Sequence, residues 1–97
     1  MKQKDVLSLL SSHREELHRQ FNVKSLAIFG SVARDEASDA SDVDLLVEFD
    51  RPTGYFGLIA LQDYLEQFLQ CHVDVGTAHS LKPRIRSKVI QECIHVA

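Results

Sequence analysis

Two aspartates separated by a single residue are the first feature of this sequence that could perform chemistry. Asp42 and Asp44 lie in SDVDLLVEF, residues 41–49, whose composition and alternation predict a β-strand. Residues i and i+2 of a strand share one face, so the two carboxylates would be neighbours. Like charges about 4 Å apart repel by about 1 kcal/mol in water and by about 4 kcal/mol near a protein surface. The pair therefore indicates either a site for a cation, or a solvated strand face with loop-capping acids.

Other residues with chemical potential precede and follow this pair. Gly30-Ser31 stands where a predicted strand gives way to a helix, a place where glycine lets a phosphate approach and free N–H groups attract anions. By itself such a glycine is more often a simple turn residue than part of a phosphate-binding site. Asp74 lies on a later short strand and faces as the pair faces, although an isolated acid is often ordinary surface. Arg34 is a candidate phosphate ligand, with a surface or ion-pair role as the alternative.

The elements that must position these residues alternate along the chain. Apolar periodicity predicts helices over 4–20, 31–36 and 55–70 and from about residue 80 onward, and strands over 24–29, 41–49 and 71–77. We expect Ser31 and Ser80 to cap the helices that they begin, and the last helix to turn inward a face made of Ile85, Val89, Ile90 and Cys93. The predicted fold class is α/β (α+β), a small mixed three-stranded sheet with helices mainly on one face. The acidic face of the sheet would stay open.

Length and composition set broad limits on function. The 97 residues predict a single domain, 1–97, and the net charge of −3 argues against direct nucleic-acid binding and against a membrane-surface protein. The sequence shows neither a signal peptide nor a membrane-spanning run, and its two cysteines are too few for a disulfide framework, so we expect a cytoplasmic location. The five histidines lack structural-zinc spacing and are interpreted as structural or surface residues.

Taken together, these motifs resemble the signature of a known superfamily. Gly30-Ser31, then Asp42-Val43-Asp44, then Asp74 on a later strand resembles the signature of the DNA polymerase β-type nucleotidyltransferase superfamily. Nearly the whole chain is similar to the minimal nucleotidyltransferase (MNT) group, including Ser31-Val32-Ala33-Arg34 and the segment 82–86.

This resemblance implies a catalytic site with three carboxylates and divalent metal. Asp42, Asp44 and Asp74 would bind Mg²⁺, with two ions expected, and Asp74 would lie closest to the attacking hydroxyl. Gly30 and Ser31, with Arg34 as a further candidate, would hold the triphosphate of ATP. Pyrophosphate would leave.

The resemblance also implies a partner. MNT proteins are similar to antitoxins paired with HEPN-domain toxins, and some members transfer AMP from ATP to a tyrosine of the toxin. The first hypothesis is therefore a Mg²⁺-dependent adenylyltransferase that silences a HEPN toxin. The alternative is a non-catalytic antitoxin that neutralises the toxin by direct binding. Transfer to a small molecule is less favoured, because the chain has no second domain to hold such an acceptor.

Overall fold

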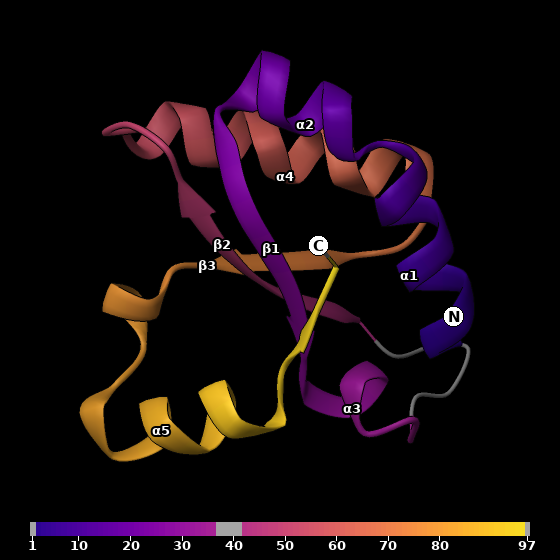
Figure 1. Cartoon of the computed structure of the whole chain (residues 1–97), viewed down its shortest axis with the longest axis vertical. Coiled ribbons are helices and arrows are strands. Elements are labelled where there is room, and N and C mark those ends of the chain that lie inside the picture. The colour runs from indigo at the N-terminus through magenta and orange to yellow at the C-terminus, as the bar shows by residue number, and fades with distance from the viewer. Residues whose placement is uncertain (1, 37–41, 97) are drawn as a thin grey trace.

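The computed structural model describes residues 2–36 and 42–96, and it has an α+β architecture (Figure 1). Its elements follow one another as α1 (Gln3–Ser12), α2 (Arg14–Phe21), β1 (Val23–Phe29), α3 (Gly30–Ala33), β2 (Val43–Phe49), α4 (Tyr55–Leu69), β3 (Val73–Gly76), a 3₁₀ helix η1 (Ala78–Ser80), α5 (Pro83–Glu92) and β4 (Ile94–His95). The predicted start of the second strand, Ser41, lies outside the described residues.

The strands form a mixed sheet in the order β3-β2-β1-β4. The central pair β1 and β2 is antiparallel, β3 runs parallel to β2, and β4 runs antiparallel to β1. The predicted fold class is confirmed, but the count of three strands is wrong. The fourth strand is two residues long, Ile94–His95, and pairs with β1 at Ile28 and Ala27. A two-residue strand carries no periodicity, so the sequence could not reveal it.

One face of the sheet carries the core. In β2 the fully or almost fully buried Val43, Leu45 and Val47 alternate with Asp44, Leu46 and Glu48, which are half-buried or exposed. Helices α1, α2 and α4 cover the buried face with Val6, Leu10, Leu17, Leu61, Leu65 and Leu69. In Figure 1, α2 and α4 lie side by side on one side of the strands, while α3 and α5 lie on the other. On that other side α5 has no buried residue and Asp44 is only half-buried, so the face with Asp44 is covered less tightly than the core face, as the sequence predicted.

The predicted N-terminal helix 4–20 is wrong in one respect, because it is two helices broken at His13. His13 has φ −104° and ψ 6°, which is outside helical geometry. Two side chains at the break bond one carbonyl of the last turn of α1, since both His13 Nδ1 and Ser12 Oγ lie 2.8 Å from Leu9 O. The His13 ring also stacks on Phe68 of α4, with 4.1 Å between ring centroids. Tertiary packing therefore fixes the break.

The C-terminal helix also differs from its prediction. It begins at Pro83 with Lys82 as N-cap, and Pro83 occupies the first turn, where its missing N–H costs nothing. Ser80 does not cap it, because its hydroxyl accepts a hydrogen bond from Thr77 N–H and donates one to Thr77 O within η1. The predicted inner face is wrong at Ile85 and Ile90, which are 41% and 50% exposed. Similarly, Ser31 does not cap α3, since the helix already begins at Gly30.

Among the residues that the structure describes, no helix combines the length and apolarity needed to cross a bilayer.

Candidate active site

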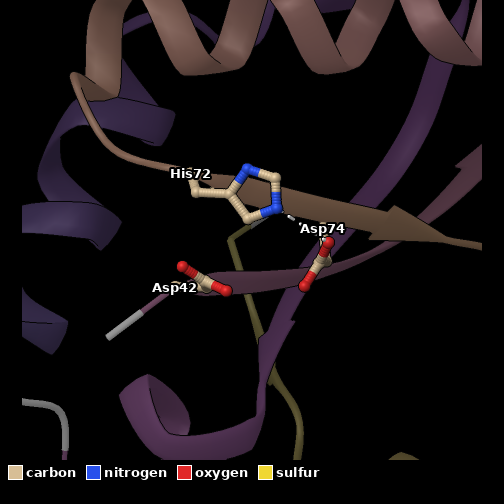
Figure 2. Close-up of side chains that lie close together, drawn as sticks. All are labelled: Asp42, His72 and Asp74. Atoms are coloured by element: carbon tan, nitrogen blue, oxygen red, sulfur yellow. Dashed lines mark ion pairs between the residues drawn. The ribbon is translucent and has the colours of Figure 1, made fainter. Parts of the chain in front are cut away.

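Strand pairing brings the three predicted acids together. In the parallel ladder between β2 and β3, Asp44 is the partner of Asp74, so the two side chains leave the sheet next to each other on the same face. Asp42 directly precedes β2, two residues before Asp44. Carboxylate oxygens of Asp42 and Asp74 lie within 4.8 Å of each other, facing a common space (Figure 2). Residues that are 32 positions apart in sequence, 42 and 74, thus meet at one end of the sheet.

The electrostatics of Asp44 show how closely these acids interact. Partial burial, the negative charges of Asp74 and Asp42, and a hydrogen bond with Asp74 all raise the pKa of Asp44 above its usual value. The positive charge of Arg34 opposes this effect only in part. A bound cation would stabilise the ionised form of Asp44, so the arrangement favours a positively charged ligand.

Gly30 brings the backbone against this acidic cluster. Its neighbour Phe29 pairs with Asp44 across β1 and β2, and Gly30 itself has φ +75°. A Cβ atom at position 30 would collide with the Asp44 carboxylate. Glycine is required here both for the positive φ and for the close approach. The Gly30-Ser31 turn and the acids therefore occupy one site.

Arg34 follows α3 and is already paired. Its Nε lies 3.1 Å from Glu36 Oε2, and one terminal nitrogen lies 3.6 Å from Glu92 Oε2. The positive charge of Arg34 nevertheless acts on Asp44, because it opposes the rise in the pKa of that carboxyl. The ion-pair role left open by the sequence is therefore present, and phosphate binding by Arg34 stays a prediction.

His72 is a site residue that the sequence analysis missed. Its Nε2 lies 3.4 Å from Asp74 Oδ1, and its Nδ1 lies 2.8 Å from Glu66 Oε2 (Figure 2 shows the first pair). The interpretation of all five histidines as structural or surface residues took no account of these neighbours. The sequence did contain a clue to this contact: His72 and Asp74 are two residues apart, so in an extended strand both lie on one face. Glu66 comes from α4, and no local pattern could have linked it to the site.

The donor set fits a hard divalent cation. Asp42, Asp44 and Asp74 supply carboxylate oxygens, which Mg²⁺ prefers to nitrogen or sulfur. Two of these acids are exposed and Asp44 is half-buried, so ions and phosphates can reach them. The arrangement could hold a metal–nucleotide complex against the open end of the sheet.

Comparison with known proteins agrees with this geometry. Residues 10–96 match the nucleotidyltransferase domain family. The chain belongs to this family. It is 38% identical to the protein adenylyltransferase MntA of Thermococcus cleftensis over 92 residues, which cover 95% of this chain and 93% of the relative.

Solved structures place the nucleotidyltransferase within its family. A structure assigned to the minimal nucleotidyltransferases superposes with a TM-score of 0.81 at 33% identity, covering 97% of this chain and 95% of the other. An MNT antitoxin from Shewanella oneidensis, solved in complex with a tri-AMPylated HEPN toxin, superposes with a TM-score of 0.67. At 17% identity, with coverage of 94% of this chain and 71% of the other, this second likeness shows the fold alone. The predicted MNT membership is confirmed, and the chain is a nucleotidyltransferase.

Proposed function

We propose that this nucleotidyltransferase transfers AMP from ATP to a tyrosine of a HEPN-domain toxin, and thereby acts as the antitoxin of the pair. The observation that carries the proposal is the convergence of Asp42, Asp44 and Asp74 beside the Gly30 turn. The relative from Thermococcus cleftensis, named a protein adenylyltransferase, supports the reaction class. The complex of an MNT antitoxin with an AMPylated HEPN toxin supports the class of partner.

The proposal gives the acids separate roles. Asp42, Asp44 and Asp74 would hold two Mg²⁺ ions, which when bound neutralise charge on the entering and leaving oxygens of a displacement at phosphorus. Asp74 would lie nearest the attacking tyrosine hydroxyl and orient it. The tyrosine oxygen forms a bond to the α-phosphorus of ATP, the bond from that phosphorus to the bridging oxygen breaks, and pyrophosphate leaves. The hydroxyl proton passes to Asp74 and then to water.

The turn after β1 would hold the phosphates. Gly30 has no side chain between the backbone and the acids, so the triphosphate can approach the main chain there. Ser31 offers a hydroxyl donor next to it, and Arg34 adds positive charge within reach of Asp44.

Exposed aromatic side chains support a macromolecular partner. Tyr55 and Phe56 at the start of α4 are 73% and 85% exposed. Large apolar groups that remain in solvent are typical of interaction surfaces when they cluster. This observation also favours the alternative function, neutralisation of the toxin by contact alone. A cytoplasmic location remains a prediction from the sequence.

The two functions are separated by one pair of experiments. The chain is incubated with a HEPN partner, Mg²⁺ and ATP labelled at the α-phosphate, and survival of cells that express the toxin is scored in parallel. We expect label on the partner, and loss of both label and protection for Asp42→Asn and Asp44→Asn. Glu48→Gln is the matched control, because Glu48 lies on β2 but pairs with Lys24 at 3.3 Å. Protection by the aspartate variants without transfer would instead establish the contact-only antitoxin.

A further inference from the structure

We propose that Asp42, His72 and Asp74 form a zinc site within the acidic cluster, and that Zn²⁺ bound there inhibits the nucleotidyltransferase by displacing Mg²⁺. The inhibitory part of this proposal rests on the function proposed above. The binding part rests only on the geometry of these side chains.

The three residues can direct their ligand atoms at one point. One imidazole nitrogen and one oxygen from each carboxylate all lie within 4.8 Å of one another. His72 Nε2 and Asp74 Oδ1 are 3.4 Å apart, which is longer than the 2.7–3.2 Å typical of an N–H···O hydrogen bond. Two ligands bound tetrahedrally to Zn²⁺ at about 2.0–2.1 Å are separated by about 3.4 Å. This pair of atoms therefore already has the spacing of one edge of a zinc tetrahedron.

Glu66 orients the histidine for this purpose. Its Oε2 atom lies 2.8 Å from His72 Nδ1 and also accepts a hydrogen bond of 3.0 Å from Val73 N–H. A carboxylate at this distance favours the tautomer with its proton on Nδ1, which leaves the Nε2 lone pair on the side of Asp74. An outer carboxylate that holds a metal-binding histidine in this way is a recurrent feature of zinc sites.

The chemistry of the donors separates this ion from Mg²⁺. Imidazole nitrogen binds Zn²⁺ well, whereas Mg²⁺ prefers oxygen ligands and octahedral geometry. Asp42 and Asp74 would belong to both donor sets, while His72 would serve only zinc and Asp44 chiefly magnesium. Occupation by Zn²⁺ therefore removes two of the three carboxylates that Mg²⁺ needs.

The test measures metal binding to the complete chain, without nucleotide or partner. The metal-free protein is titrated with Co²⁺, whose visible absorption reports tetrahedral nitrogen and oxygen ligands, and Zn²⁺ affinity is then measured by competition with a chromophoric chelator. We expect His72→Gln to weaken Zn²⁺ binding by at least about 100-fold and to abolish the tetrahedral Co²⁺ spectrum. We expect Glu66→Gln to weaken binding by about 10–100-fold, as outer-shell substitutions do.

Control variants distinguish a specific loss of Zn²⁺ binding from unfolding of the chain and from damage to the proposed magnesium site. His79→Gln should bind Zn²⁺ like the unmodified protein, because His79 is exposed on η1 and outside the cluster. In Glu66→Gln the remaining carbonyl oxygen can still accept the Val73 N–H bond, so melting temperature should not change. Asp44→Asn should keep zinc binding. Unchanged Zn²⁺ affinity in His72→Gln, or loss of zinc binding in Asp44→Asn, would overturn the site.

The inhibition is measured separately, by adding Zn²⁺ to the transfer reaction at constant Mg²⁺. We expect transfer to fall as the site fills, and the Zn²⁺ concentration for half inhibition to rise at least about tenfold in Glu66→Gln, in line with its weaker zinc binding. Binding without inhibition would overturn the regulatory role and leave the site intact. Absence of transfer at any metal concentration would refute the proposed function, while the Co²⁺ and Zn²⁺ measurements would still decide the zinc site.

Discussion

At the scale of single residues, Asp44 is repelled by the other acids of the site. It is half-buried between Asp74 and Asp42, and both neighbours disfavour its ionised form. Its pKa is raised in the folded protein, so between the ordinary carboxyl pKa and this raised value the native state binds more protons than the unfolded state. The contribution of Asp44 to stability is therefore present at low pH and is lost as the pH rises through the raised pKa.

The Asp44→Asn variant should consequently be more stable than the unmodified chain at neutral pH in EDTA. Solvent screening limits the gain to about 1 kcal/mol or less, which corresponds to up to about 4–8 °C in melting temperature for a domain of this size. Thermal melts from pH 3 to pH 8 would measure it. The difference between the two proteins should vanish at the acidic end, and a difference independent of pH would contradict the electrostatic explanation.

A substitution at Gly30 would test the turn that lies beside the acids. Gly30→Ala places a Cβ on a residue with φ +75° and against the Asp44 carboxylate, so we expect a loss of about 1–3 kcal/mol in stability and weaker Mg²⁺ binding. Urea unfolding and calorimetric Mg²⁺ titration would measure these effects. Gly54→Ala is the control, because Gly54 has φ −77° and no atom within 4 Å of a new Cβ. Its cost should be about 0.5 kcal/mol, since alanine is a poorer N-cap than glycine.

At the scale of elements, the two faces of the sheet differ in how tightly helices cover them. Helix α4 buries Leu61, Leu65 and Leu69 against the strands, whereas α5 has no fully buried residue. The periodicity of α4 predicted its bounds to within one residue. The same reasoning failed for α5, because it assumed that an apolar stripe always finds a surface to cover it.

This difference predicts unequal effects of two truncations. Leu65→Ala should lower the free energy of unfolding by about 2–5 kcal/mol, because the side chain is fully buried. Ile90→Ala should lower it by about 1 kcal/mol or less, because Ile90 is 50% exposed. Urea denaturation of both variants provides the comparison. Equal losses would mean that α5 packs more tightly in solution than the structure shows.

At the scale of the whole molecule, folding creates the candidate cation site. Asp42 and Asp74 belong to segments that meet only when β2 and β3 pair, so the unfolded chain has no equivalent site. A ligand that binds only the folded state stabilises it in proportion to the logarithm of its concentration. Metal binding and global stability should therefore be coupled.

Mg²⁺ at about 100 times its dissociation constant should accordingly add about 2.7 kcal/mol to the stability of the unmodified chain. The double variant Asp42→Asn, Asp44→Asn should show no such gain. Calorimetric melts with and without MgCl₂ would check this, with NaCl at equal ionic strength as a control for general screening. An equal response to NaCl would contradict specific binding.

The sequence by itself determined the parts that depend on local order. Alternation in SDVDLLVEF directed Asp44 to the face opposite Val43 and Leu45, and a glycine after a strand marked the turn at Gly30, because side-chain direction in a strand and freedom at glycine are local properties. Only the tertiary structure decided what depends on distant partners: the parallel register that places Asp74 beside Asp44, the break at His13 against Phe68, the fourth strand, and the approach of Glu66 to His72. These contacts join residues whose proximity is set by packing of the whole chain, and no window of sequence contains that information.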